Sequence, residues 1–378
     1  MKLEVSLTTE APLAISRWRA TGNELETLRH VPGTAWRGAL AADIVRERKL
    51  KEHAHCDSRF HALFLEGKVR FGDLRPNGAA PWPLSARECS RNQAHGVHDL
   101  LVRSALGDEI PLGCIFGPKD RACDAKLALP QGFFVWNRDL AAPEPSRPMV
   151  RIVAHTAIDG AVLLPRPGQF FSSEVVEGGT QFEGEIWLKD PALKAEFDHP
   201  RQLAIGRGAT RGQGLAKLEF HPPPPPSEAN LRQRVAGLNG RFESTGLVAF
   251  TCTLRSACLV YDDWLCARSY LLPSDIGEAA SVPPGELEAY RLTAWFSRMI
   301  TIGGWNARAS LPKGDIHALA PGSAFLFTRS VAPRERDAEM DRLACILAAC
   351  ETGIGERWEE GFGEAVFCDP FHYALRRS

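Results

Sequence analysis

The sequence predicts an α+β protein made of two tandem ferredoxin-like units, each a split βαβ arrangement. Two observations predict this fold. A glycine-rich pattern occurs twice, each time after a helix-like stretch and before a strand-like stretch near the end of one half. A run of prolines separates the halves, and such a run must be extended and cannot lie inside a sheet.

The glycine-rich pattern marks one structural unit that is present twice. Its copies begin at Ile205 and Ile354 and keep one register without a gap. An offset of 149 residues superposes Gly206, Gly212 and Gly214 on Gly355, Gly361 and Gly363. Because glycine is needed where the backbone has a positive φ or approaches another group closely, both copies should form the same turn.

Each half should open with a strand and close with a helix, the glycine loop and a final strand, because apolar and β-branched residues recur in the strand segments. In the first half these are a strand at residues 3–7, a helix at 192–197, the loop at 206–214 and a strand at 215–220. In the second half they are a strand at 247–254, a helix at 336–350, the loop at 353–363 and a strand at 365–368.

The boundary between the halves follows His221, where five prolines occupy positions 222–226. Residues 227–238 then have the apolar spacing of a short connecting helix. We therefore assign residues 1–220 to the first domain, with an insert at about 81–136, residues 221–244 to the linker and its helix, and residues 245–378 to the second domain.

Composition excludes several classes of protein. With 378 residues, 44% of them hydrophobic and 24% charged, the chain has ordinary globular composition rather than disorder. A net charge of −1 argues against a nucleic-acid binder driven by bulk electrostatics, although it leaves room for a local basic groove. Ten cysteines without a short disulfide framework, no apolar stretch of membrane-spanning length and no signal-peptide pattern predict a cytoplasmic protein.

The first glycine loop combines Arg207 and Arg211 with four glycines, Gly206, Gly208, Gly212 and Gly214. Guanidinium groups beside bare backbone are suited to binding a phosphate chain, so this loop is a candidate RNA contact. The alternative is a helix-to-strand turn whose glycines only avoid steric clashes. The second loop favours that alternative because glutamates surround its glycines, and a dinucleotide site is excluded because the glycines follow a helix instead of opening one.

The insert carries cysteines and histidines that could bind zinc, which is often held by two close ligand pairs. Cys89 with His95 would form one pair, and Cys114 with Cys123 the other. The alternative is buried cysteines with surface histidines. A second group, His53, His55, Cys56 and His61, has no partner pair nearby and is interpreted as a polar loop.

Catalytic motifs are weak throughout the chain. Asp262-Asp263 follows an apolar strand as metal-binding carboxylates do, but a surface strand end explains it more simply. His98-Asp99 lacks further ligands, and no Walker A, serine-hydrolase or His-Glu-x-x-His motif is present. We expect no enzymatic activity.

Several segments together resemble the CRISPR-associated RAMP superfamily, whose members bind CRISPR RNA (crRNA) through tandem ferredoxin-like, RRM-like domains. The two glycine loops resemble the hallmark of that superfamily. Further segments that are similar lie at residues 30–40 (His-Val-Pro-Gly-Thr-Ala-Trp-Arg-Gly-Ala-Leu), 69–73, 155–159 and 179–184. In the second half, residues 303–306, 311–313 and 320–325 resemble the Csx-ten subunits of type III-D effector complexes.

The resemblance implies a non-catalytic crRNA-binding subunit in antiviral defence, located at the 5′ repeat-tag end of a ribonucleoprotein. Its neighbours would be a large polymerase-like subunit and a backbone RAMP subunit. Similar proteins carry a Cys, a His-Gly-Val and two further Cys in the insert, which supports a structural zinc ion. The eight residues between Cys114 and Cys123 depart from the usual spacing of two.

The segment at 30–40 suggests a second RNA contact. Thr34 could cap a helix running from Ala35 toward Arg48, and Arg37 in its first turn could face the same anion. The alternative is a plain capped helix with Trp36 in the core. Two other functions stay open: an RNA-cleaving RAMP protein that uses His30, His53 or Asp57, and a scaffold that never touches RNA.

Overall fold

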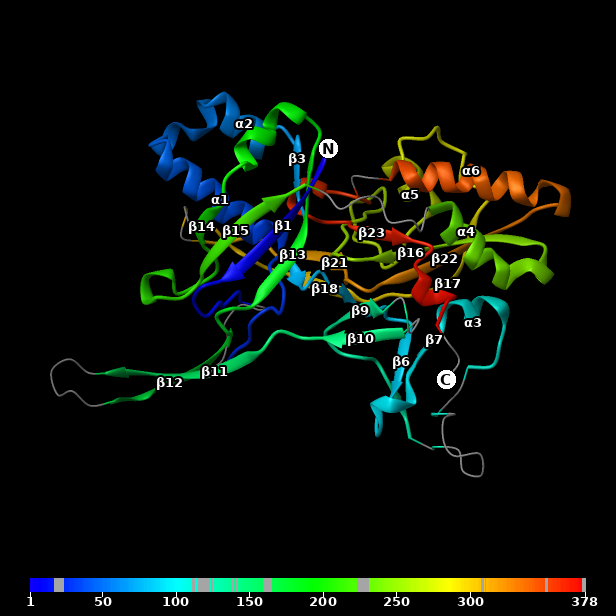
Figure 1. Cartoon of the computed structure of the whole chain (residues 1–378), viewed down its shortest axis with the longest axis horizontal. Helices are drawn as coiled ribbons and strands as arrows, with labels where there is room; N and C mark the ends of the chain where they lie inside the picture. The colour runs from blue at the N-terminus through cyan, green and yellow to red at the C-terminus, as the bar shows by residue number, and fades with distance from the viewer. Residues whose placement is uncertain are drawn as a thin grey trace.

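The computed structural model describes residues 1–16, 24–110, 113–114, 123, 125–137, 139, 142–158, 165–222, 231–306, 309, 311–350 and 353–375 (Figure 1). Its secondary structure is mixed α+β, and nearly all its strand pairs are antiparallel. Within this part of the chain, no helix has the length and apolar character needed to cross a bilayer.

The first half is built on one sheet in the order β14-β15-β1-β13-β3, with β4 also paired to β13. In chain order its strands are β1 (Lys2–Thr9), β3 (Val69–Phe71), β4 (Arg75–Pro76), β13 (Gln181–Leu188), β14 (Arg201–Ala204) and β15 (Leu215–His221). Along β1, Leu3, Val5 and Leu7 are buried and alternate with residues on the opposite face of the sheet, as the two-residue period of a strand requires.

Helix α1 (Gly33–Glu47) covers the buried face of this sheet because Trp36, Leu40 and Ile44 recur every four residues along one side of the helix. The shorter helical segments of this half are η1 (Lys51–Cys56), α2 (Ser58–Phe64), η3 (Pro191–Phe197) and η4 (Ala209–Arg211). The expected helix at 192–197 is therefore a 3₁₀ helix. A further strand that the sequence did not predict, β14, follows it.

The second half has a sheet in the order β17-β22-β16-β23. Its strands are β16 (Leu247–Leu254), β17 (Arg291–Phe296), β22 (Ala324–Ser330) and β23 (Ala365–Phe367). Its helical segments are α4 (Leu231–Asn239), η5 (Gly240–Thr245), α5 (Pro273–Ala279), η6 (Pro333–Glu335), α6 (Arg336–Ala349), η7 (Trp358–Glu360) and η8 (Pro370–His372). The expected strand at 247–254 and the expected helix at 336–350 are confirmed to within one residue. Helix α4 corresponds to the expected connecting helix, whose first residues lie outside the described ranges.

The two sheets repeat one strand order. Counted along the chain, the four main strands of each half lie in the order fourth, first, third, second, with every neighbouring pair antiparallel. In the first half these are β15, β1, β13 and β3, and in the second half β23, β16, β22 and β17.

Between its second and third strands, each half carries a hairpin. In the first half β11 (Val150–Ile158) and β12 (Pro165–Val176) form a long ribbon that projects from the body, with β2 (Glu24–Leu25) at its base (Figure 1). The corresponding strands of the second half are β18 (Met299–Ile302), β19 (Trp305–Asn306), β20 (Leu311–Pro312) and β21 (Ile316–Leu319).

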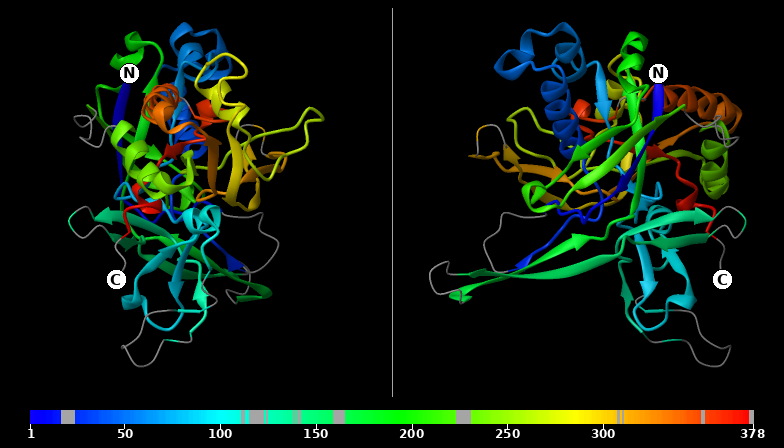
Figure 2. Two further views of the ribbon diagram at one scale, coloured as in Figure 1. Left: turned by 90° about the vertical axis from the view of Figure 1, so that its right-hand side faces the viewer. Right: turned by 60° about the vertical axis from the view of Figure 1, so that its left-hand side comes forward.

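The insert forms a lobe below the two sheets (Figure 2). Its elements are β5 (Ala80–Pro81), β6 (Ala86–Cys89), η2 (Gln93–His95), β7 (Val97–Asp99), α3 (Leu101–Leu106), β8 (Leu127–Ala128), β9 (Phe133–Asn137) and, just beyond it, β10 (Ala142–Ser146). Leu101 and Val102 of α3 lie in the core of the second half. Trp82 and Phe134 pack around Phe371 near the C-terminus. The insert therefore belongs to the first half in sequence but packs on the second half in space.

Candidate nucleic-acid interface and metal centre

The two glycine loops share one hydrogen-bond framework. We call residues 205–214 loop 1 and residues 354–363 loop 2. In loop 1 the N–H groups of Ile205, Arg207 and Gly214 donate to the carbonyls of Gly214, Ala14 and Pro12 at 2.8, 2.9 and 2.9 Å. In loop 2 those of Ile354, Glu356 and Gly363 donate to Gly363, Leu259 and Ala257 at 2.9, 2.9 and 2.7 Å. The repeat read from the sequence is thus a repeat in structure.

Steric demand explains the shared glycines. Gly206 and Gly355 have φ values of 80° and 77°, and a Cβ atom on either would lie 2.2 Å from a carbonyl oxygen of the strand extension that the loop crosses. Gly214 and Gly363 are equally crowded by the first residue of their own loop. Steric demand therefore accounts for these glycines in both loops, while the RNA contact of Gly206, Gly208, Gly212 and Gly214 stays a prediction.

The surroundings of the two loops differ. Loop 2 is covered by the first half, because Gly361 lies against Phe71 and Gly33, and Trp358 lies under the Lys189 ammonium group at 3.9 Å. In loop 1 the matching turn, η4, is exposed at all three residues. One copy of the loop is thus an internal contact between the halves, whereas the other is open to solvent.

The arginines of loop 1 lack counter-ions among the described residues. Arg207 is half-buried, its Nη2 atom is buried without a hydrogen-bond partner, and this burial lowers the pKa of its guanidinium group. Arg211 is exposed four positions further on. A half-buried cation without a carboxylate gains most from an external anion.

The charges of loop 2 are instead used internally. Arg357, which takes the left-handed conformation of Gly208 in loop 1, pairs with Glu360 at 2.7 Å. Glu364 accepts two hydrogen bonds from Arg75, at 3.1 and 2.5 Å, and thereby joins the second half to the first. Although burial opposes the charged form, Arg75 holds the pKa of Glu364 below its usual range.

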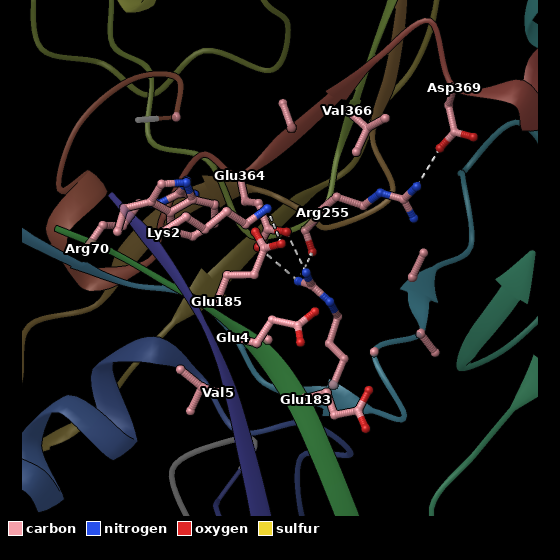
Figure 3. A pocket seen from close by; sticks show the side chains of 18 of the residues that line it. Lys2, Glu4, Val5, Arg70, Glu183, Glu185, Arg255, Glu364, Val366 and Asp369 are labelled. Atoms are coloured by element: carbon pink, nitrogen blue, oxygen red, sulfur yellow. Dashed lines mark hydrogen bonds and ion pairs between the residues drawn. The ribbon is translucent and has the colours of Figure 1, made fainter. Parts of the chain in front are cut away.

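A cavity of about 1100 Å³ lies beside this ion pair, between the two halves (Figure 3). Glu4, Glu183 and Glu185 line it from the outward face of β1 and β13. Arg70 stacks over Trp187 at 4.5 Å, and Arg255 pairs with Asp369 at 2.5 Å. Since its carboxylates are at least as numerous as its cations, the cavity is not an attractive path for a phosphate chain.

The start of helix α1 differs from the expectation for Thr34 and Arg37. The helix begins at Gly33 after Pro32, and Thr34 lies inside its first turn and caps nothing. The carboxylate of Asp73 already accepts the Gly33 N–H at 2.9 Å. Arg37 turns toward α2 and donates to the Phe64 carbonyl. The proposed cap is therefore wrong, because a buried aspartate satisfies the helix terminus, while the RNA contact of Thr34 and Arg37 stays a prediction.

Trp36 lies in the core, as the alternative interpretation of this helix expected. Its ring packs edge-on against Phe71 at 4.9 Å, and its Nε1 donates to the Gly72 carbonyl at 2.8 Å. The helix start therefore contacts loop 2 and the first sheet, on the inside of the molecule.

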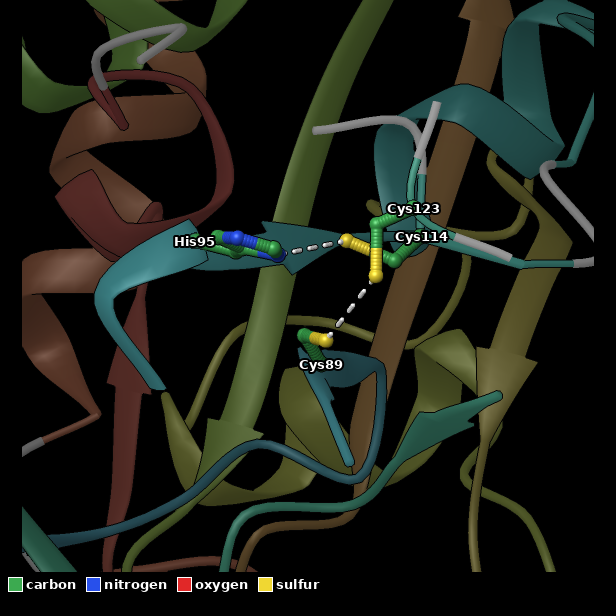
Figure 4. Close-up of side chains that lie close together, drawn as sticks. All are labelled: Cys89, His95, Cys114 and Cys123. Carbon is green, nitrogen blue, oxygen red and sulfur yellow. Dashed lines mark hydrogen bonds between the residues drawn. The ribbon is translucent and has the colours of Figure 1, made fainter. Parts of the chain in front are cut away.

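The four predicted metal ligands of the insert come together (Figure 4). The Sγ atoms of Cys89 and Cys123 are 3.8 Å apart, and Nδ1 of His95 is 3.3 Å from Sγ of Cys114. All four ligand atoms lie within 4.8 Å of one another. Two thiolates bound tetrahedrally at about 2.3 Å from zinc would be separated by about 3.8 Å, so the arrangement can hold a tetrahedral ion.

The local chemistry of this cluster suits a metal thiolate. Burial opposes the charged form of Cys89, but backbone donors at Arg91 and Asn92, with contacts from Cys114 and His95, lower its thiol pKa to about 6. Among the described residues, this is the one group of three or more potential ligands close enough to share an ion. His98 lies on β7 outside it, and the rival group around His53 and His61 does not assemble.

A second buried network, which the sequence did not predict, joins the insert to the second half. The Ser85 hydroxyl donates to Asp99 at 2.5 Å, Asp99 bonds Nδ1 of His372 at 3.0 Å, and Nε2 of His372 lies 2.7 Å from Oγ1 of Thr253. Thr253 is fully buried, so this Thr-His-Asp order is structural and not a catalytic triad. Burial opposes the imidazolium form, but Asp99 raises the pKa of His372.

This raised pKa predicts a pH dependence of stability. Since Asp99 favours the protonated form of His372 in the folded protein, its stabilising contribution is complete below pH about 6.5 and is lost as the pH rises through the folded-state pKa. We expect the difference in unfolding free energy between wild type and His372→Gln to shrink over that rise, measured by denaturant titration at a series of pH values. A difference that stays constant across the series would contradict the assignment.

The residues considered for RNA cleavage have three different surroundings. His30 is largely buried between Asp73 and Phe133, and this burial lowers its pKa. Asp57 caps α2 by accepting the Phe60 N–H at 2.8 Å, and His53 is exposed on η1. RNA cleavage by any one of them stays an untested alternative.

Comparison with known proteins gives only distant matches. No protein-family model and no curated protein matches the sequence. A chain from the type III-B Cmr-beta complex bound to cognate target RNA and AMPPnP is 12% identical, with a TM-score of 0.43, and the match covers 91% of this chain and 94% of that chain. The Cmr4 (Cas7) protein of Pyrococcus furiosus is 14% identical, with a TM-score of 0.26 over 59% of this chain and 100% of its own.

A Cas6 product complex is also similar, at 14% identity and a TM-score of 0.31 over 50% of this chain and 80% of the other. At this level of similarity, the matches establish neither a shared fold nor a shared function.

Proposed function

We propose that this chain is a non-catalytic crRNA-binding RAMP subunit of a type III CRISPR effector ribonucleoprotein, of the Csx-ten kind, which caps the 5′ repeat-tag end. Its partners would be crRNA, a large polymerase-like subunit and a backbone RAMP subunit. The distant structural matches include a type III-B complex bound to target RNA and a Cas6 product complex, in keeping with this proposal.

The strand order of each half supports the fold in this proposal. The strands lie in the order fourth, first, third, second, and all neighbours are antiparallel. Helical crossovers follow the first and third strands. This is the order of a split βαβ or ferredoxin-like unit. We infer two such units in tandem, joined through the linker and through the packing of loop 2 on α1 and β3.

One observation carries the RNA-binding proposal: loop 1 holds a half-buried arginine, Arg207, without a counter-ion among the described residues, and a second, exposed arginine, Arg211. Loop 2 has the same hydrogen-bond framework, but its Arg357 pairs with Glu360 within the loop, and Glu364 just beyond it pairs with Arg75 of the first half. Phosphate contacts position a nucleic acid through such arginines, while a single-stranded RNA leaves its bases free for other contacts.

We also propose that the Cys89, His95, Cys114 and Cys123 cluster binds a structural zinc ion. Three sulfur ligands and one imidazole form a common closed zinc set, which leaves no open position for catalysis. The ion would hold Cys114 and Cys123 against β6 and η2.

The test of the RNA proposal is the double variant Arg207→Glu and Arg211→Glu. We expect it to lose crRNA during purification and, in direct titration, to reduce the salt slope of binding by about two, because two phosphate contacts are removed. Its melting temperature should equal that of wild type, since neither arginine is paired in the described part of the fold.

A matched control reverses two other exposed arginines, Arg46→Glu and Arg334→Glu, with the same change in net charge. Retention of crRNA should be unchanged in this control. Equal retention by the loop 1 variant would favour the scaffold alternative, and cleavage of labelled repeat or target RNA by the purified chain would favour the nuclease alternative.

A further inference from the structure

A turn in the second half, residues 261–267, presents two large apolar side chains to solvent; we call it the Trp264 turn. Trp264 is 86% exposed and Leu265 is 81% exposed. Both values far exceed those of the neighbouring Leu259, Val260 and Leu271, which are buried in the fold. The turn therefore projects into solvent, while the residues that flank it are buried in the fold.

The Trp264 turn is held rigidly by its own hydrogen bonds. Oδ1 of Asp262 accepts the N–H groups of Trp264 and Cys266 at 2.9 and 2.8 Å. The backbone adds bonds from Asp262 N–H to the Cys266 carbonyl at 3.0 Å and from Leu265 N–H to the Asp262 carbonyl at 2.9 Å. The two apolar side chains are thus presented in a fixed arrangement.

The base of the turn is fixed to helix α5. The guanidinium of Arg268 donates to the Tyr261 carbonyl at 2.9 Å and to both carboxylate oxygens of Asp275, at 3.0 and 2.5 Å. Leu265 itself has a φ of 60°, an unfavourable conformation for a residue other than glycine. Strain of this kind persists where surrounding structure enforces it and is found at ligand-binding positions.

The charge around the turn selects the class of partner. The turn itself carries two carboxylates, Asp262 and Asp263, and the cation at its base, Arg268, is already paired with Asp275. Such a surface repels a phosphate backbone, so stacking of Trp264 on an RNA base is disfavoured. Exposed, pre-organised tryptophan is instead typical of the energetic centre of protein–protein interfaces.

We propose that the Trp264 turn is a protein-docking element that inserts into an apolar pocket on a partner protein. Lysine or arginine side chains surround this pocket. Trp264 and Leu265 fill the pocket, and Asp263 faces the basic rim. Tyr270 and Leu272, which follow the turn in the sequence and are 40% and 38% exposed, extend the apolar contact at its base. This site is separate from loop 1 and does not depend on RNA binding.

The test places the photo-crosslinking residue p-benzoyl-phenylalanine at position 264 and irradiates the assembly purified from its native host through a tag on this chain. We expect a crosslink to one protein, in a peptide where apolar residues are flanked by Lys or Arg. A crosslink to RNA, or no crosslink beyond that of the same probe at Trp305, which is 62% exposed, would overturn the proposal.

Two variants add an independent measurement in the same assembly. Trp264→Ser should reduce retention of the crosslinked partner roughly 30-fold, the factor that corresponds to about 2 kcal/mol. Asp263→Lys should also weaken retention, while Trp305→Ser should not. Both turn variants should keep their RNA, whereas the Arg207→Glu and Arg211→Glu variant should lose RNA and keep the partner, so failure of either proposal is recognised separately.

Discussion

Cys114→Ser is expected to abolish stoichiometric zinc binding and to unfold the insert locally. Elemental analysis of wild type should give one zinc ion per chain, and that of the variant close to none. The reason is that the binding free energy of a structural zinc ion, about 10–16 kcal/mol in zinc-finger peptides, is also folding free energy. Hydrogen exchange should become faster in residues 81–136, because Cys89 and Cys114 form a small buried cluster of their own.

The matched control is Cys345→Ser, at an exposed thiol on α6 outside the cluster. It should leave both the zinc content and the exchange of the insert unchanged. Treatment of wild type with a strong chelator should reproduce the Cys114→Ser pattern. Normal zinc content in Cys114→Ser, or an insert equally protected without metal, would show that the cluster is only a group of buried cysteines.

Glu364→Ala is expected to lower the free energy of unfolding by about 3–5 kcal/mol, the usual effect of removing one partner of a buried ion pair. Arg75 and Glu364 are 10% and 16% exposed, and they connect the two halves through two hydrogen bonds. Without Glu364, the one remaining hydrogen-bond acceptor of the Arg75 guanidinium among the described residues would be the Arg255 carbonyl, at 3.2 Å. Denaturant unfolding monitored by circular dichroism measures the loss.

The double variant Arg75→Met and Glu364→Leu tests the cause. Because it removes both charges and keeps apolar volume, it should recover a large share of the lost stability. The control is Glu359→Ala, at a glutamate of loop 2 that forms no ion pair with any described residue. This variant should change stability by less than about 0.5 kcal/mol. A small effect of Glu364→Ala would mean that the halves do not depend on this pair.

The repeat could be read from the sequence because both copies place the same restriction on the same positions. A positive φ and a carbonyl oxygen 2.2 Å from the position of a Cβ atom, that of Ala14 or of Leu259, restrict Gly206 and Gly355 to glycine. The strand at 247–254 and the helix that ends at Ala349 were predictable because apolar periodicity is a property of short segments. The four cysteine and histidine ligands were also predictable, because zinc chemistry limits the residue types.

What the sequence could not determine is which surface each unit turns outward. Loop 1 and loop 2 share one hydrogen-bond framework, but Gly33 and Phe71, which lie far from loop 2 in the sequence, cover loop 2 and leave loop 1 open. The segment around Arg37 has residues typical of an anion site. In the structure, however, Arg37 donates to the Phe64 carbonyl, and the Asp73 carboxylate accepts the Gly33 N–H at the helix start. The insert packs on the second half, and its Asp99 meets His372 across 273 positions.

The physical reason is the range of the interactions. Strand alternation, positive φ and ligand type are properties of a few neighbouring residues, so the sequence alone determined a duplicated α+β unit, a basic glycine loop and a set of Cys and His residues that could hold a metal ion. Burial and counter-ion pairing depend on contacts between distant segments. Tertiary structure alone decided that Arg207 of loop 1 has no counter-ion among the described residues, whereas Glu364 beside loop 2 pairs with Arg75. This difference separates the exposed loop 1 from the structural loop 2.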